Sequence, residues 1–289
     1  MRASFAGAPS PVAASVVRER TVREAMGAIK NSQYAGAGAI DLHLSCLNEE
    51  CKNEESLRQI MSVTDLPILV LNYNQDYEYN LFTDDEEHRI SLLEMGAAAG
   101  ASCVDLQAYS FNYAVKKSFQ SEYATEEMLF AAKKPNELAL DPETVARQRE
   151  FIDRMHAQGT EVLLSCHTGV YLNCEETLSL ARVLEQRKPD VIKIVVPCTT
   201  DAELAENFRT MITLKQEITS CKIHFHCSGK KGKLTRIVNP MLGAHLAFCI
   251  ERYNASTNYD QLDLRSYTQM LRQLDWRDST PGSGAASSK

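Results

Sequence analysis

The sequence predicts an α/β protein of the (β/α)8 barrel class, also called a TIM barrel. Eight short apolar runs alternate along the chain with eight amphipathic or capped stretches. Parallel strands that are buried on both faces give near-continuous apolar runs of this kind. The length of 289 residues and the hydrophobic content of 44% suffice for one large core. Eight strand–helix units in a chain of this length indicate a closed barrel.

The expected strands are short and rich in Val, Ile, Leu and Ala. In chain order they cover residues 12–17, 38–44, 66–72, 101–107, 160–166, 191–196, 221–227 and 244–250. Apolar runs of this length between helical stretches favour strands over buried helices. Because a helix is expected after each strand, the strands should run parallel to one another.

The segments between these strands carry helix signals. The expected helices cover residues 21–30, 54–62, 84–99, 141–158, 174–188, 201–216, 233–241 and 262–274. Acidic residues open the segment 84–99, where the helix dipole favours negative charge. Asp141-Pro142-Glu143 joins a capping residue to a proline in the first turn, which is typical of a helix start.

Two segments interrupt the alternation of strands and helices. An insertion at about 110–140 is polar, and its first half contains the aromatic residues Phe111, Tyr113, Phe119 and Tyr123. It follows the fourth strand, on the face where barrel active sites lie, so a lid and an oligomer contact are both open interpretations. We therefore expect an N-terminal extension at 1–11, a single barrel domain at 12–276, and a disordered Ser/Gly-rich tail at 277–289.

The overall charge and the cysteines limit the partners and the compartment. The net charge of −7 and the isoelectric point of about 5.6 argue against a nucleic-acid surface. Neither a membrane-spanning apolar run nor a convincing signal-peptide core is present in the sequence. Nine cysteines form an odd set, and several of them fall inside expected buried strands. This pattern predicts a reduced, cytoplasmic protein that binds neither nucleic acid nor membrane.

The strongest functional signal is a pair of polar residues at the ends of two neighbouring strands. His167 ends an apolar run after Glu161, and Lys193 lies inside the run from Asp190 to Pro197. The helix between the two runs makes a strand–helix–strand unit, which brings the strands side by side. Desolvation lowers the pKa of a buried lysine and makes it an amine nucleophile, and a histidine beside it can carry protons. The pair predicts Schiff-base chemistry on a carbonyl substrate, whereas a lysine that reaches solvent beside a core histidine is the structural alternative.

Several motifs resemble one known enzyme family. They are Leu164-Ser-Cys-His167 with the downstream Glu175-Glu176, Val191-Ile-Lys193-Ile-Val-Val-Pro197, the glycine-rich Ser228-Gly-Lys-Lys-Gly232-Lys-Leu-Thr-Arg236, and Pro240-Met-Leu-Gly-Ala-His-Leu-Ala-Phe248. In these motifs the chain is similar to the type I 3-dehydroquinate dehydratases. The similarity covers most of the chain, from about residue 12 to 276, and its most specific part is the second half.

The resemblance implies a cofactor-free and metal-free hydro-lyase. In that family a lysine forms a Schiff base with the substrate ketone and a histidine moves the protons, so the implied catalytic residues are Lys193 and His167. Arg236 would bind a substrate carboxylate or hydroxyl, and Ser256 and Gln261 would stand near the closing loop. The implied substrate is a small hydroxylated cyclic ketone or keto acid, such as 3-dehydroquinate or a related compound of shikimate or quinate metabolism.

The first half of the chain departs from the family pattern. The family carries a Glu-x-Arg pair on its second strand, where this sequence has Asp41-Leu-His43, and an arginine at the end of its third strand, where Tyr73 or a neighbour stands here. A histidine does not replace the bidentate guanidinium of arginine. We therefore expect an altered substrate pocket whose wall includes Asp41, His43 and Tyr73.

Other functions remain open at this point. The same lysine chemistry supports carbon–carbon cleavage, as in class I aldolases. Loss of the two arginines motivates a catalytically silent regulator that binds a metabolite. A metal-dependent barrel enzyme that uses His224, His226 and Cys227 is a further alternative, although the spacing fits no standard zinc pattern. A homodimer stays open as the assembly.

Overall fold

The computed structural model describes residues 2–73, 75–76, 81–82, 85–253 and 261–273. Nine parallel strands form one curled sheet in the order β11-β10-β1-β2-β3-β6-β7-β8-β9. They are β1 (Val12–Val17), β2 (Ala39–His43), β3 (Ile68–Leu71), β6 (Cys103–Gln107), β7 (Glu161–His167), β8 (Val191–Pro197), β9 (Lys222–Ser228), β10 (Leu246–Ile250) and β11 (Leu262–Asp263). The short strands β4 (Gln75–Asp76) and β5 (Leu81–Phe82) pair separately and antiparallel. The predicted tail lies outside the described residues.

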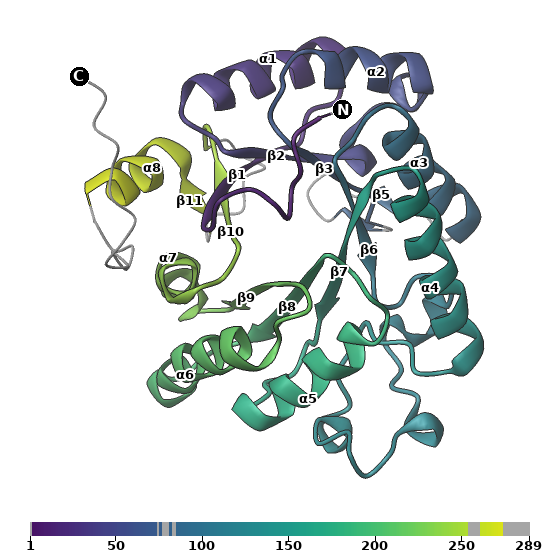
Figure 1. The fold of residues 1–289 in the computed structure, drawn as a ribbon, viewed down its shortest axis with the longest axis vertical. Helices are drawn as coiled ribbons and strands as arrows, with labels where there is room; N and C mark the ends of the chain where they lie inside the picture. The colour runs from purple at the N-terminus through teal and green to yellow at the C-terminus, as the bar shows by residue number, and fades with distance from the viewer. Residues whose placement is uncertain (1, 74, 77–80, 83–84, 254–260, 274–289) are drawn as a thin grey trace.

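The helices lie outside the strands, as Figure 1 shows. They are α1 (Val22–Tyr34), α2 (Glu54–Ser62), α3 (Glu86–Ala98), α4 (Pro142–Ala157), α5 (Cys174–Glu185), α6 (Asp201–Glu217), α7 (Gly232–Leu242) and α8 (Leu264–Gln273). Capping boxes at Thr21, Asn173 and Thr200 satisfy the first N–H groups of α1, α5 and α6. The alternating strands and helices confirm the predicted (β/α)8 barrel class.

The barrel has a seam between β9 and β10. Within the described residues no strand ladder joins these two strands, but His245 N donates a hydrogen bond of 2.7 Å to Ile223 O. Helix α7 packs against both strands and covers the seam. Gly232 starts α7 against the carbonyl oxygen of Cys227, where a Cβ atom would overlap that oxygen. This close approach fixes the path of the chain toward Arg236, one turn further along.

The barrel interior changes from apolar to polar along the strands. Near the amino ends, one buried cluster fills it with Phe5, Val12, Ala14, Ala39, Leu69, Cys103, Leu163, Val191, Leu246 and Phe248. Two residues further along, on the same face of each strand, stand Asp41, Asp105, Ser165, Lys193 and His224. All five are buried. Burying polar groups costs free energy unless they pair, so their concentration toward one end marks the functional end of the barrel.

The N-terminal segment before β1 closes the apolar end of the barrel. Phe5 is fully buried in the interior cluster, and its N–H donates a 2.6 Å hydrogen bond to the Glu161 carboxylate. The same carboxylate accepts from Ala6 N at 3.0 Å. Ser10 Oγ lies 2.6 Å from His245 Nδ1. In Figure 1 this segment crosses the centre of the barrel. Access to the interior is therefore left to the carboxyl ends of the strands.

The insertion between β6 and α4 crosses this open end. Asp141 Oδ2 accepts from Asn112 Nδ2 at 3.1 Å and from Gln120 Nε2 at 3.0 Å, which ties the insertion to the start of α4. Further along, Asn136 N donates to Thr168 O at 2.7 Å. The insertion thus returns beside the end of β7, where His167 stands.

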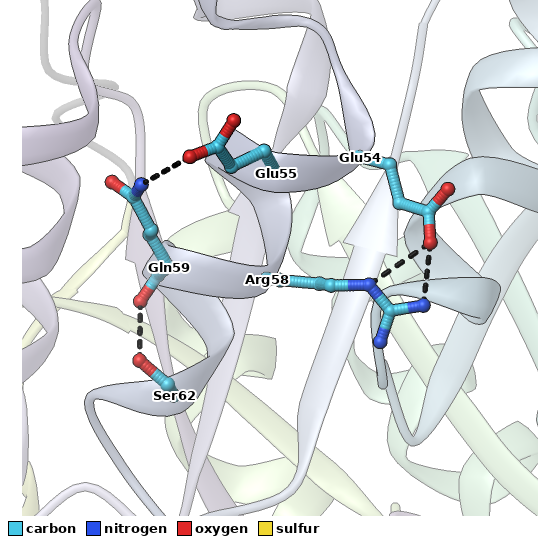
Figure 2. A pocket seen from close by; sticks show the side chains of 5 residues that line it. All are labelled: Glu54, Glu55, Arg58, Gln59 and Ser62. Carbon is cyan, nitrogen blue, oxygen red and sulfur yellow. Dashed lines mark hydrogen bonds and ion pairs between the residues drawn. The ribbon is translucent and has the colours of Figure 1, made fainter.

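The outer faces of the helices are polar. On α2, Arg58 Nε donates to Glu54 Oε1 at 2.9 Å, and Ser62 Oγ donates to Gln59 O at 2.8 Å (Figure 2). The surface depression between these side chains lies on the outside of the barrel, away from the polar interior. Among the described residues, no helix combines the length and apolarity that a membrane span requires.

Candidate active site

Lys193 lies at the centre of the polar end of the barrel. It is 6% exposed, and β8 places it level with His224 on the neighbouring strand. Its Nζ atom is 3.0 Å from the Tyr73 hydroxyl and 3.7 Å from Asp105 Oδ2. The ring centroid of Phe248 is 5.3 Å away. The predicted lysine is therefore held inside the barrel, with one hydroxyl and one carboxylate within reach.

Asp105 is a site residue that the sequence patterns did not single out. It is fully buried on β6, and its Oδ1 accepts hydrogen bonds from Ser165 Oγ at 2.5 Å and from Gln107 Nε2 at 3.1 Å. Within the described residues its Oδ2 makes no hydrogen bond and faces the Lys193 ammonium instead. An aspartate inside an apolar strand run, in phase with the inward-facing Cys103, was the available signal.

His167 ends β7 and is held by a carboxylate from the insertion. Its Nδ1 lies 2.8 Å from Glu137 Oε2, and its backbone N–H lies 3.3 Å from the same oxygen. Burial raises the pKa of Glu137, but the charge and hydrogen bonds of His167 outweigh it and lower that pKa. An ionised Glu137 accepts from Nδ1–H, which fixes the tautomer and leaves Nε2 for proton transfer.

Tyr73 follows β3 and lies among the other pocket side chains. Its ring centroid is 5.8 Å from that of His167 and 6.3 Å from that of His43, both edge-on. Burial and the charges of Asp105 and other nearby carboxylates raise the pKa of Tyr73 well above its ordinary value, although the charge of Arg18 opposes this rise. The phenol is therefore neutral at physiological pH.

The second strand contributes Asp41 and His43. Both side chains are buried, and His43 Nε2 is 3.5 Å from Asp41 Oδ2. The edge-on contact of His43 with Tyr73 connects this pair to Lys193. The structure thus brings together three predicted pocket residues and the predicted nucleophile.

Two buried histidines complete the interior beside Lys193. His224 Nε2 lies 2.8 Å from His226 Nδ1 on β9. Burial lowers the pKa of both imidazoles well below the ordinary value, and the charges of Lys193 and Arg236 lower them further, so both rings are neutral at pH 7. Cys227 points to the opposite face, where its Sγ is 2.6 Å from Asn207 Oδ1. In the described part of the chain, no three His, Cys, Asp or Glu side chains form a group that could hold a metal ion.

The remaining predicted residues lie around the mouth of the barrel. Arg236 on α7 is near enough to the histidine pair for its charge to act on both rings. Gln261 is 8% exposed and directly precedes β11, which pairs with β10. Ser256 lies outside the described residues. Arg18, which the sequence patterns did not single out, follows β1 in phase with the inward-facing Ala14, and its charge acts on Tyr73.

Comparison with known proteins places this arrangement in a family. The model of the type I 3-dehydroquinases matches residues 114–277, which is more than half of the chain. The chain belongs to the type I 3-dehydroquinase family. The match confirms the resemblance that the motifs predicted and the class of hydro-lyase that it implied.

Individual relatives agree with this assignment. A 3-dehydroquinate dehydratase of Dehalococcoides mccartyi is 23% identical over 246 residues, which cover 85% of this chain and 90% of the relative. The crystal structure of the Clostridium difficile type I 3-dehydroquinate dehydratase with covalently modified comenic acid matches with a TM-score of 0.70 at 14% identity, covering 94% of this chain and 98% of that one. The Geobacillus kaustophilus enzyme matches with a TM-score of 0.68 at 12% identity, covering 92% and 93%. These likenesses support the barrel fold.

The matched region divides the family site into two parts. Glu137, His167 and Lys193 lie inside the matched residues 114–277, as do the histidine pair and Arg236. Arg18, Asp41, His43, Tyr73 and Asp105 precede it.

Proposed function

We propose that this chain dehydrates 3-dehydroquinate or a closely related hydroxylated cyclic ketone, with Lys193 as the Schiff-base lysine and His167 as the general acid and base. One observation carries the proposal. The amine of Lys193 is buried at the open end of the barrel, while the adjacent strand presents an imidazole that Glu137 holds in one tautomer. Family membership favours dehydration over carbon–carbon cleavage by the same iminium and over a silent binding role.

The first chemical stage is formation of the iminium. His167 takes a proton from the Lys193 ammonium, and the neutral amine adds to the ketone carbon of the substrate. A proton then moves from nitrogen to the former ketone oxygen. The imidazolium returns its proton to this oxygen, which leaves as water while the C=N⁺ bond forms. His167 is then neutral and ready to act as a base.

The second stage removes water from the substrate. The iminium withdraws electrons and acidifies the adjacent C–H bond, so that neutral His167 takes the proton and an enamine forms. The enamine expels the β-hydroxyl group, to which His167 delivers the proton, and the iminium becomes conjugated. Hydrolysis of that iminium releases an unsaturated ketone and restores Lys193, so the net change is the loss of one water molecule.

Asp105 and Glu137 support the two reacting groups. Asp105 Oδ2, at 3.7 Å from Nζ, compensates the positive charge of the resting ammonium and then of the iminium. A fixed carboxylate beside a developing cation lowers the barrier because it needs no reorganisation during the reaction. Glu137 stabilises the imidazolium that forms when His167 accepts a proton.

Recognition of the substrate rests on the residues around the mouth. We assign Arg236 and Arg18 the substrate carboxylate or hydroxyl groups, because a guanidinium offers a planar set of donors to such groups. Asp41, His43 and Tyr73 form the wall that replaces the arginines of the second and third strands. Gln261, together with Ser256, would contact the substrate from the side of β10 and β11.

The proposal also covers cofactor, compartment and assembly. The lysine amine supplies the electron-withdrawing centre, so the proposed reaction needs no cofactor. All nine cysteines are free thiols, which supports a reducing compartment such as the cytoplasm. The exposed side chains of Tyr123 and Leu129 on the insertion support a homodimer contact there.

A turnover assay tests the proposed function. With purified protein and 3-dehydroquinate, the conjugated ketone product absorbs in the ultraviolet, and we expect its steady formation by the wild type. Lys193→Ala should reduce the rate to background, and His167→Ala should reduce kcat by about 10²–10⁴-fold. Lys222→Ala, at the exposed amino end of the next strand, is the matched control and should retain wild-type activity. Full activity of Lys193→Ala would overturn the proposal.

A further inference from the structure

We propose that Tyr73 is a catalytic proton carrier for Lys193. When the Schiff base forms, its phenol takes a proton from Nζ and passes its own proton to the carbinolamine oxygen. The same relay runs backward when the iminium is hydrolysed. This inference rests on the proposed Schiff-base function and adds a reacting group from β3, a strand outside the region that the family model matches.

The contact between the two groups is a direct one. Nζ of Lys193 lies 3.0 Å from the Tyr73 oxygen but 5.7 Å from the centre of its ring. The amine therefore meets the hydroxyl and not the face of the ring. Asp105 Oδ2, at 3.7 Å, lies beyond hydrogen-bond distance of Nζ. Among the described residues, Tyr73 is the side chain that shares a hydrogen bond with Lys193.

The protonation state of Tyr73 suits a relay. Its pKa is raised by burial and by the negative charges of Asp105, Glu137 and Asp41, in that order. A phenol that stays protonated has one hydrogen to donate and lone pairs with which to accept. It can therefore accept the proton of a positively charged nitrogen while it gives its own proton to an oxygen, and it ends the step unchanged.

The relay removes a geometric difficulty in the first stage. Addition of the amine produces a positively charged nitrogen and a negatively charged oxygen on one carbon, and direct transfer between them requires a strained four-membered ring. A hydroxyl that bridges both atoms transfers the proton through a larger ring. Protonation of the oxygen by imidazolium His167 then completes the loss of water, so atoms and charges balance.

His167 is less suited to this particular transfer. Its Nδ1 is bound to Glu137, so one ring nitrogen alone is available for protons. The Tyr73 ring lies edge-on to the imidazole at a centroid distance of 5.8 Å, while its hydroxyl reaches Lys193. The two groups therefore divide the proton transfers, with Tyr73 at the nitrogen and His167 at the substrate carbon and leaving oxygen.

Rapid-quench trapping with borohydride tests the relay. Enzyme in excess is mixed with 3-dehydroquinate and quenched at increasing times, and the reduced adduct on Lys193 is quantified by peptide mass. In Tyr73→Phe we expect adduct formation to slow by about 10²-fold or more, as for loss of one proton-transfer group. Binding of the dehydrated product, measured by calorimetry, should change less than threefold. Tyr267→Phe removes a buried phenol whose oxygen has no hydrogen-bond partner among the described residues, and it should trap at the wild-type rate.

Each outcome separates the relay from the function on which it rests. Adduct formation by Tyr73→Phe at the wild-type rate would overturn the relay and leave Tyr73 as pocket wall. Adduct formation that slows only in proportion to weaker binding would overturn the relay as well. Absence of any adduct in the wild type would instead overturn the Schiff-base function itself.

Discussion

The two parts of the site differ in how closely they follow the family. The reaction half comprises Glu137, His167 and Lys193, and it lies within the matched residues 114–277. The recognition half comprises Asp41, His43 and Tyr73, and it lies before them. The proposed chemistry depends on an amine and an imidazole on adjacent strands, whereas the wall of the pocket depends on the shape and charge of one substrate. The difference indicates that the reaction is retained while substrate recognition has changed.

This division is not complete, because two residues cross it. Asp105 lies before the matched region but contacts the reacting amine. Tyr73 lies on the recognition side yet shares a hydrogen bond with Lys193. A polar site that is built for one substrate rejects compounds that leave its buried groups unpaired. Substitutions on each side of the division should therefore affect different kinetic constants.

The largest effect is expected for Asp105→Asn. The amide keeps the shape but removes the charge opposite the iminium, and kcat should fall by about 10²–10³-fold, as for loss of one preorganised electrostatic group. Substrate binding should change little. The measurement is steady-state kinetics, with thermal unfolding as the check that the variant folds. A change confined to KM would place Asp105 in the recognition half instead.

Glu137→Gln should have the next largest effect. The amide can still contact His167 but no longer stabilises the imidazolium, so kcat should fall by about 10–100-fold, in line with losses seen for orienting partners of functional histidines. Glu143→Gln, on the same stretch of chain but at the exposed start of α4, serves as the control. Equal activity of the two variants would contradict the role assigned to Glu137.

The arginines at the mouth should act on binding. Removing a charged hydrogen bond to the substrate costs about 1.5–3 kcal/mol, so Arg18→Ala and Arg236→Ala should each raise KM by about 10–100-fold. The rate of Lys193 adduct formation at saturating substrate should stay near that of the wild type. Arg20→Ala, an exposed neighbour of Arg18, is the control. A fall in the saturated trapping rate would move either arginine into the reaction half.

The smallest effect concerns the attachment of the insertion that carries Glu137. Burial opposes ionisation of Asp141, but hydrogen bonds from Thr144, Gln120 and Asn112 lower the pKa of this N-cap residue to about 2. A lowered carboxyl pKa stabilises the fold above the unfolded value near 3.8, and that contribution is lost as pH falls toward 2. Asp141→Ala should cost about 1 kcal/mol at pH 7 and progressively less below pH 4.

Urea unfolding of wild type and Asp141→Ala at several pH values measures this difference. A stability gap that stays constant from pH 7 to the acid range would show that the charge of Asp141 contributes nothing. A gap that narrows on acidification, together with lower activity of the variant at neutral pH, would connect the cap to the position of Glu137.

Most of the fold could be predicted because local patterns encode it. The strand at 12–17 and the helix at 54–62 are found as predicted, and the other strands and helices differ mainly at their ends. The helix predicted for 174–188 ends at Glu185, and Lys188 beyond it adopts a left-handed conformation with φ of 60°. Apolar periodicity carried the prediction past that end, because it does not record where the backbone turns.

The site was predictable where strand position alone brings residues together. Lys193, His167, Asp41 and His43 lie on barrel strands, and the register of parallel strands fixes their neighbours. Glu137 was not predictable, because its place beside His167 depends on the path of a long insertion without regular periodicity. Asp105 and Arg18 gave a signal in the alternation of their strands, but a single polar residue in that position has several uses.

The central claim is that Lys193 becomes covalently attached to the substrate. Borohydride reduction of the wild-type protein with 3-dehydroquinate, followed by intact mass and peptide mapping, tests it directly. The account predicts one substrate-dependent adduct, located on Lys193 and absent from Lys193→Ala. An adduct on another lysine, or steady turnover with no trapped adduct, would contradict it.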